Sequence, residues 1–271
     1  MSKNSLLSVV AIISLSGLVT CGGGAKYSKL QGSTMGTYYS ITYGEGESCS
    51  PQKKAVDNLL AHINSVMSTY ESDSELSLIN QNLQAGEYAI SQELHLVLGA
   101  SLMIWQETRG AFDVTIGPLV NLWGFGPTKA EETPTEFEQD AVAERIGMEN
   151  LELASNSIVK KQPNLFIDLS AIAKGYAVDR VAERLISFGC KDYLVDIGGE
   201  SIAKGRNQAG THWKIGIEVP SSERRGIQRV LALSDLAIAT SGDYRNFRET
   251  AVGRVSHVMD PRTKLPVTSN I

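Results

Sequence analysis

The sequence predicts an α+β fold in which helices pack on a mixed β-sheet. Apolar residues recur at helical spacing in residues 51–67, 92–108 and 171–188, which indicates amphipathic helices. Residues 38–43 and 213–219 instead alternate between apolar and polar side chains, as half-buried strands do. Hydrophobic residues make up 42% of the chain and charged residues 20%, which is typical of a soluble globular protein.

The N-terminal residues have the pattern of an export signal. Residues 1–20 combine an early lysine with an apolar run at 6–19, which is shorter than the roughly 20 apolar residues that a membrane span needs. Cys21 follows directly, and residues 21–26 form a glycine-rich tether. This arrangement resembles a bacterial lipoprotein signal with Cys21 as the lipidated residue. The alternative is a plain cleaved signal with an incidental cysteine. The folded domain is expected at 27–271.

Charge and cysteine content narrow the function classes. The formal net charge is −5, which argues against nucleic-acid binding, as does the lack of a long basic run. Besides Cys21, the chain has Cys49 and Cys190, and neither lies in a C-x-x-C metal motif. An oxidising compartment would permit a disulfide between them, but two separate thiols fit the sequence equally well.

The first half of the domain is predicted to be one strand followed by three helices. The strand covers 38–43, and Pro51 occupies the first position of the first helix. Ser74 begins a second, shorter helix. The third helix runs from about 92 to 108 and is followed by a turn at 110–113.

The second half is predicted to place one long helix between short strands. A surface helix within 133–147 is expected to precede a hairpin, and a buried strand at 165–167 to lead into the long helix, which ends at Gly189. Further strands are predicted at 193–197, 213–219 and 228–233, and His257 is expected on a strand just before a turn.

The stretch from Phe166 to Asp179 carries the most informative chemistry. Asp168 follows the predicted strand, Ser170 is placed to cap the helix, and Lys174 lies in its first turn. Free N–H groups and the helix dipole attract anions to this end, whereas a cation there opposes the dipole. An anionic ligand such as a phosphate would explain Lys174. The alternative is an ordinary connection with a solvated lysine.

Five ordered stretches, including this one, resemble the FAD:protein FMN transferases of the ApbE family. They are STMGTYYSI (33–41), GAFDVTIGPLVNLWGFG (110–126), DLSAIAKGYAVD (168–179), LVDIGGE (194–200) with ATSGDYRNF (239–247), and SHVMDPRTKLPV (256–267). The resemblance implies two lobes around a nucleotide cleft. It also implies an Mg²⁺-dependent enzyme that attaches FMN from FAD to a threonine of a target protein and releases AMP.

The resemblance assigns roles to individual residues of this chain. His257 would be the base that takes the threonine proton, because an imidazole can accept a proton at neutral pH. The carbonyl of Ala171 would bind magnesium. FAD would be bound by Met35, Tyr70, Ala111, Phe112, Asp113, Asp168, Lys174, Gly198, Gly199 and Met259.

The resemblance also has implications beyond the site. The remaining metal ligands are expected beyond Ile271, so the C-terminal part of the domain is expected to be missing. The expected targets are subunits of membrane redox complexes, either the Na⁺-pumping NADH:quinone reductase or its Rnf relatives. The expected location is the periplasmic side of the bacterial inner membrane, through a lipid anchor. Two other functions use the same site, namely FAD binding without transfer and hydrolysis of the FAD pyrophosphate.

Overall fold

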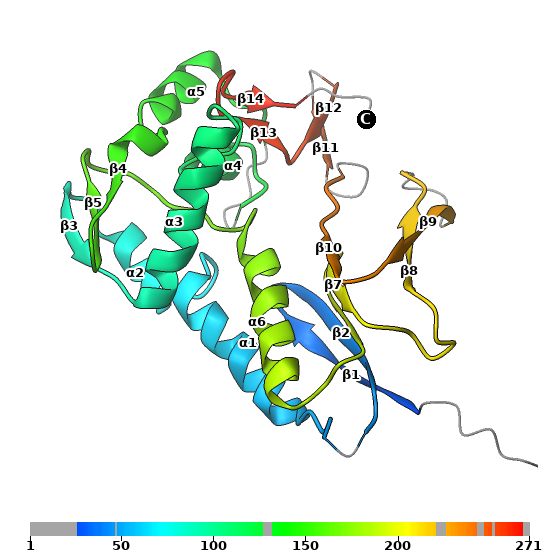
Figure 1. The fold of residues 1–271 in the computed structure, drawn as a ribbon. Coiled ribbons are helices and arrows are strands. Elements are labelled where there is room, and N and C mark those ends of the chain that lie inside the picture. Colours follow the sequence, from blue (N-terminus) through cyan, green and yellow to red (C-terminus); the bar gives the residue numbers. More distant parts are fainter. Residues whose placement is uncertain are drawn as a thin grey trace, which may run out of the picture.

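The computed structural model has an α+β architecture, as predicted (Figure 1). It describes residues 26–46, 48–126, 132–220, 226–242, 247–250 and 253–267. The predicted leader and Cys21 lie outside these residues. No helix within the described ranges is long and apolar enough to cross a membrane.

The largest sheet among the described residues has five strands in the order β1-β2-β6-β7-β10. All its pairings are antiparallel, whereas a mixed sheet was predicted. Its strands are β1 (Tyr27–Thr34), β2 (Thr37–Gly44), β6 (Tyr193–Ile197), β7 (Glu200–Lys204) and β10 (Leu236–Ile238). Two-residue turns join β1 to β2 and β6 to β7. Both turns therefore lie at sheet ends, where chain reversals leave backbone accessible.

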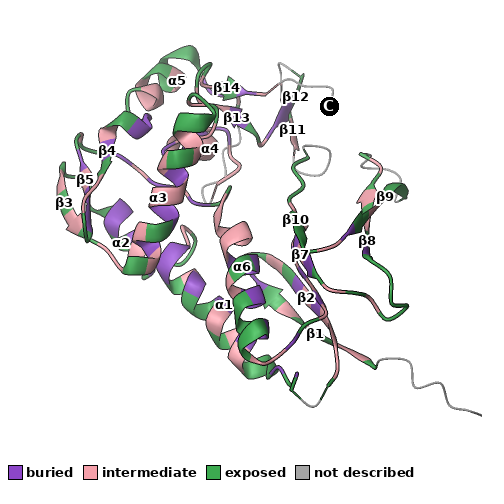
Figure 2. Ribbon diagram, in the orientation of Figure 1, coloured by how far each residue is buried: buried purple, intermediate pink, exposed green. Residues whose placement is uncertain are grey.

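Two long helices cover this sheet. They are α1 (Lys53–Met67) and α6 (Ala173–Ser187), which pack against each other; α6 also packs against β6 and β7. Each helix has one buried and one exposed side (Figure 2). The apolar stripe of α6 is buried as its spacing predicted, with Ala177, Val181 and Leu185 fully inside the main core.

A smaller sheet and two further helices complete the main lobe. The sheet has the order β3-β5-β4, and it lies beside α3 on the left in Figure 1. The elements are α2 (Glu75–Gln81), β3 (Gly86–Ala89), α3 (Gln92–Glu107), β4 (Leu151–Leu153) and β5 (Ser157–Lys160). The predicted hairpin and third helix are confirmed, and Ser74 caps α2 by accepting the Ser77 N–H.

A second apolar cluster forms the core of the part drawn at the top of Figure 1. Its elements are α4 (Gly117–Leu122), α5 (Glu136–Ala143), β11 (Phe247–Thr250), β12 (Gly253–Ser256), β13 (Met259–Asp260) and β14 (Leu265–Pro266). Leu119, Trp123 and Met259 are buried there. A 3₁₀ turn (Met148–Asn150) follows α5 in the chain, and its Met148 is buried in the main core. A separate hairpin of β8 (Trp213–Glu218) and β9 (Ile227–Leu233) lies to the right of the sheet in Figure 1.

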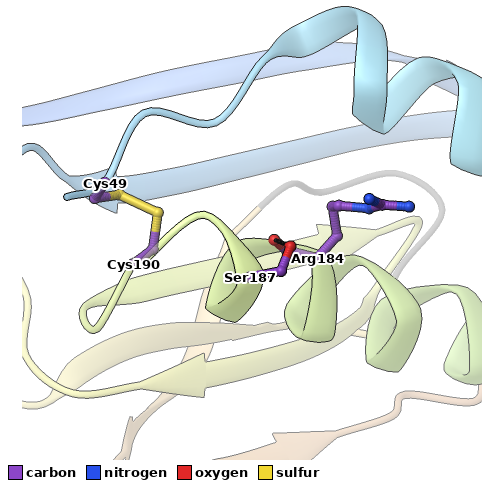
Figure 3. The surroundings of a disulfide bond; sticks show 4 residues. All are labelled: Cys49, Arg184, Ser187 and Cys190. Atoms are coloured by element: carbon purple, nitrogen blue, oxygen red, sulfur yellow. Dashed lines mark hydrogen bonds between the residues drawn. A yellow bond between two sulfur atoms is a disulfide. The ribbon is translucent and has the colours of Figure 1, made fainter.

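Cys49 and Cys190 form a disulfide, which decides the question that the sequence left open (Figure 3). Their Cα atoms are 4.5 Å apart although 141 residues separate them in the chain. The bond joins the loop before α1 to the loop after α6. Gly189 ends α6 with φ +75° and packs directly against the Ser48 carbonyl, so the two loops are in close contact.

Four local predictions are wrong, and one of them concerns His257, which lies in the bend between β12 and β13 and not on a strand. Residues 165–167 form no strand, because the Asn80 side chain takes the place of a neighbouring strand: its Nδ2 donates to the Ile167 carbonyl (2.8 Å) and its Oδ1 accepts the Ile167 N–H (2.9 Å). Pro51 precedes α1, whose N-cap is Gln52. Ser170 does not cap α6, because its hydroxyl donates to Asp168 instead.

Candidate active site

A cavity of about 650 Å³ lies where three separate parts of the chain meet. The parts are the β1–β2 turn, the end of α1 with the loop after it, and the N-terminus of α6. The lining residues are Met35, Gly36, Asn64, Met67, Ser68, Thr69, Tyr70, Glu71, Ser170, Ala173 and Lys174. The structure therefore brings together three predicted flavin contacts, Met35, Tyr70 and Lys174.

The β1–β2 turn presents Met35 and Gly36 to this cavity. Thr34 pairs with Thr37, so only these two residues make the turn, and both have positive φ (+50° and +69°). A two-residue turn with positive φ at both positions matches the twist of antiparallel strands. A side chain at Gly36 would meet no atom within 4 Å, so the backbone here is open to a ligand.

Serine hydrogen bonds fix the loop that carries Tyr70. The Ser68 hydroxyl accepts the N–H groups of Tyr70 and Glu71, both at 3.1 Å. The Ser68 carbonyl accepts the hydroxyls of Ser74 (2.5 Å) and Ser77 (2.9 Å). Tyr70 is 67% exposed, so its ring offers a stacking face to a ligand. Partial desolvation, and then the negative charge of Asp168, raise the pKa of Tyr70, which places Asp168 near this wall.

The N-terminus of α6 supplies the cation of the cavity. Ile172 is the N-cap and makes no side-chain cap, so Lys174 lies in the first turn as predicted. The Lys174 Nζ donates to Glu200 Oε2 at 2.7 Å. Asp168 Oδ1 accepts both the N–H (2.8 Å) and the hydroxyl (2.5 Å) of Ser170. Lys174 thus pairs with Glu200 and not with Asp168.

The Gly198–Gly199 turn lies next to the β1–β2 turn. Both glycines have positive φ (+59° and +106°), and a Cβ at Gly198 would lie 2.7 Å from Thr37 Cγ2. The Gly199 carbonyl accepts the Thr240 hydroxyl at 3.3 Å. A larger residue at 198 would push the turn away from Thr37, which follows the cavity-lining residues directly. The pair borders the cavity wall without lining it.

Phe112 and Asp113 face the protein interior, whereas Ala111 is exposed. Phe112 packs against the main core, and Ala111 continues the turn after α3. The Asp113 carboxylate accepts the Thr115 N–H (2.7 Å), the Thr115 hydroxyl (2.6 Å) and the Met148 N–H (3.3 Å). Burial raises the pKa of Asp113, and these hydrogen bonds counter part of the rise. In this structure, Asp113 holds together the turn and the 3₁₀ segment.

His257 and Met259 belong to the second apolar cluster. The His257 ring packs edge-on against Phe125, with 6.2 Å between ring centroids. Met259 is buried among Trp123, Leu119 and their neighbours. Neither residue lines the cavity, and Ala171 is exposed beside it at the approach to α6. The structure therefore does not bring His257 into the wall that holds Lys174.

Several residues of the site were not predicted from the sequence. Asn64, Ser68, Thr69 and Glu71 line the cavity, and Glu200 pairs with Lys174. The run of hydroxyl and acidic residues at 68–74 directly after a helix was a usable signal for a hydrogen-bonded loop. Glu200 was quoted in a motif, but nothing local indicates that it reaches a lysine 26 residues away.

Magnesium ligands are not gathered in the described part of the chain. Within those residues, no three His, Cys, Asp or Glu side chains lie close enough together to hold a metal ion. Asp168 is the acidic residue nearest to the α6 N-terminus in sequence, and the Ala171 carbonyl is the ligand that the resemblance assigns. Octahedral magnesium needs more oxygen ligands than these.

Comparison with known proteins agrees with the motifs. The sequence profile of the ApbE family matches residues 35–271. A protein of Vibrio cholerae named FAD:protein FMN transferase is 43% identical over 267 residues, which are 97% of this chain and 80% of that protein. Proteins of the same name are 38% identical in Haemophilus influenzae (99% of this chain, 81% of the relative) and 34% identical in Escherichia coli K12 (89% and 71%).

Solved structures share the fold. The flavin transferase ApbE from Vibrio cholerae superposes with a TM-score of 0.83 at 42% identity, covering 90% of this chain and 79% of that one. The apo form of the Pseudomonas stutzeri flavinyl transferase ApbE gives a TM-score of 0.80 at 32% identity, covering 90% and 77%. With a profile match over most of its length and relatives above 30% identity, the chain belongs to the ApbE family.

Proposed function

We propose that the protein is an FAD:protein FMN transferase, which joins the FMN part of FAD to a hydroxyl of a target protein and releases AMP. The observation that carries this proposal is the cavity that unites Met35, Tyr70 and Lys174. Membership of a family whose named relatives carry out this reaction supports it. The targets we propose are threonines in subunits of the Na⁺-pumping NADH:quinone reductase or of Rnf complexes.

The cavity suits a flavin nucleotide in size and chemistry. Its volume of about 650 Å³ lies within the range of small-molecule sites, roughly 300–1,000 Å³. The Tyr70 ring offers an aromatic face, and Met35 offers a polarisable apolar contact. Lys174 and the N-terminus of α6 attract the negative diphosphate.

The reaction is a phosphoryl transfer in which one P–O bond replaces another. The threonine oxygen bonds to the phosphorus on the flavin side, and the bond from that phosphorus to the bridging oxygen breaks. AMP leaves with the bonding electron pair as a phosphate monoester. The hydroxyl proton passes to a base, for which we propose His257. Lys174 stabilises negative charge on the diphosphate, and such placement of charge provides much of the catalysis in this class.

The proposal that Mg²⁺ takes part, with the Ala171 carbonyl as one ligand, rests on the family resemblance. The described residues do not fit a complete magnesium shell. Removal of divalent metal with EDTA, followed by return of Mg²⁺, tests this proposal. Full transfer in EDTA would contradict it.

In-gel flavin fluorescence tests the function directly. The protein is mixed with FAD, Mg²⁺ and a target domain that carries the acceptor threonine, and the target band should become fluorescent. His257→Ala should still bind FAD but transfer about 10²–10⁴-fold more slowly, the usual loss for one positioned base. A dark target with intact bound FAD would indicate a binding protein, and free FMN with AMP would indicate a pyrophosphatase.

We further propose that Cys21 carries lipid and anchors the protein on the periplasmic side of the inner membrane. The apolar run that ends at Cys21 supports this. The disulfide between Cys49 and Cys190 supports an oxidising compartment. Cys21→Ser should move the protein from the membrane fraction to the soluble periplasm. A wild-type protein that fractionates as soluble would contradict the anchor.

A further inference from the structure

The ion pair between Lys174 and Glu200 links the cavity to the sheet beneath it. Lys174 lines the cavity and Glu200 does not. The Nζ–Oε2 distance is 2.7 Å, and the side chains are 31% and 17% exposed. Both groups are therefore largely shielded from solvent, so this contact holds its geometry better than a fully exposed pair.

The backbone of Glu200 is fixed by its surroundings. Glu200 is the first residue of β7 and pairs with Ile197 across a two-residue glycine turn. Gly198 donates its N–H to the Tyr38 carbonyl (3.1 Å), and Gly199 accepts the Thr240 hydroxyl. The carboxylate is thus presented by a strand that is hydrogen-bonded within the main sheet. A lysine held by it cannot sample its full range of rotamers.

The chemistry of the pair favours a role in positioning. An ammonium carries three N–H donors, and Glu200 engages one of them, which leaves donors for phosphate oxygens. Lys174 also lies in the first turn of α6, where the helix dipole disfavours a cation, and the carboxylate offsets this cost. A free lysine would lose rotamer freedom when FAD binds, whereas a held one has already lost it.

We propose that Glu200 is a positioning residue, which holds the Lys174 ammonium at the cavity wall so that it meets the diphosphate of FAD. This inference rests on the proposed function. Glu200 acts through Lys174 and does not contact the nucleotide. Its contribution therefore exists only while residue 174 is a cation.

A double-mutant cycle on FAD affinity tests this role. The dissociation constant of FAD is measured by quenching of flavin fluorescence for wild type, Glu200→Ala, Lys174→Ala and the double variant. Glu200→Ala should weaken binding roughly 2–10-fold, the value of one pre-ordered side chain. Lys174→Ala should weaken it more, and adding Glu200→Ala to Lys174→Ala should change nothing further. Glu200→Gln, which keeps the shape and an acceptor oxygen, should fall between wild type and Glu200→Ala.

A second ion pair provides a matched control. Lys161 and Glu152 pair at 3.3 Å on the small sheet, with side chains 47% and 59% exposed, and neither lines the cavity. Glu152→Ala and Lys161→Ala should leave FAD affinity unchanged. Urea unfolding of each variant separates a loss of folding from a loss of positioning, and Glu200→Gln keeps the test valid if Glu200→Ala does not fold.

Four results would overturn the inference. Equal weakening by Glu200→Ala in the presence and absence of Lys174 would show that Glu200 acts independently. Tighter FAD binding by Glu200→Ala would show that the carboxylate only competes for the ammonium. If the wild type binds FAD and transfers FMN, and both Glu200 variants bind FAD as tightly as it does, this inference alone would be overturned. A wild type that binds no FAD would overturn the proposed function, and the inference with it.

Discussion

At the scale of single residues, Asp113 shows how a predicted ligand contact also serves the fold. Its carboxylate is buried and accepts three hydrogen bonds from Thr115 and Met148. Burial raises its pKa above the ordinary 3.8. The Asp113 carboxyl group therefore stays protonated up to a higher pH in the folded protein than in the unfolded chain. The resulting contribution to stability is fully present below about pH 3.8 and is lost as the pH rises through the raised pKa.

Asp113→Asn should lower the free energy of unfolding by about 1–3 kcal/mol at pH 7, because an amide cannot accept all three hydrogen bonds. The variant has no carboxyl group at position 113 to titrate. The free energy of unfolding of wild type should therefore exceed that of the variant by more as the pH falls from 7 towards 4. Urea unfolding at both values measures this, with Asp73→Asn in an exposed loop as the control. A difference in free energy of unfolding that shrinks towards pH 4 would contradict the raised pKa of Asp113.

At the scale of elements, Asn80 on α2 determines the path of the chain into the site. It is buried, and its amide bonds both backbone groups of Ile167. The next residue, Asp168, donates its N–H to the Val114 carbonyl at 2.7 Å. One side chain thus replaces a strand neighbour, and this holds the segment that leads to Ser170 and Lys174.

Asn80→Ala should lower the free energy of unfolding by about 2–6 kcal/mol, because two buried backbone groups lose their partners at about 1–3 kcal/mol each. Asn80→Asp keeps an acceptor for the Ile167 N–H, but it places a carboxylate oxygen against the Ile167 carbonyl and buries a charge, so it should lose at least as much. Chemical denaturation of the three proteins measures the order. A loss below about 0.5 kcal/mol for Asn80→Ala, the size of an ordinary surface change, would contradict this role.

The same elements show what the sequence could predict. Helices α1, α3 and α6 and the β4–β5 hairpin were predictable because periodic burial leaves a periodic pattern. β1 was missed because only Thr34 is buried in it, and its pairing is supplied by β2. Residues 165–167 were predicted as a strand because their apolar side chains are needed for burial, whereas the hydrogen bonds come from a distant asparagine. The Lys174–Glu200 pair likewise depends on tertiary contact alone.

At the scale of the whole molecule, a disulfide and an assembled cavity define the architecture. The bond between Cys49 and Cys190 ties the start of α1 to the end of α6, the two helices that cover the main sheet. The opposite ends of these helices, the C-terminus of α1 and the N-terminus of α6, contribute to the cavity. The bond therefore constrains the same helix pair that supports Tyr70 and Lys174.

Replacing both Cys49 and Cys190 by serine should lower the free energy of unfolding by about 2–5 kcal/mol, since the bond closes a long loop in the unfolded chain. Reductant should lower the melting temperature of wild type to that of the variant and leave the variant unchanged. Thermal unfolding with and without reductant measures this. A wild type that melts identically in both conditions would show that the bond contributes nothing to stability.

We propose that the cavity of Met35, Tyr70 and Lys174 binds FAD for transfer of its FMN part. The most direct measurement is the ratio of AMP released to target protein flavinylated, determined by chromatography and intact-protein mass in one reaction. We expect equal amounts of the two products in wild type, and a higher FAD concentration for the half-maximal rate in Lys174→Ala. AMP release with FMN free in solution and an unmodified target would contradict the proposal, and so would equal half-maximal FAD concentrations in the two proteins.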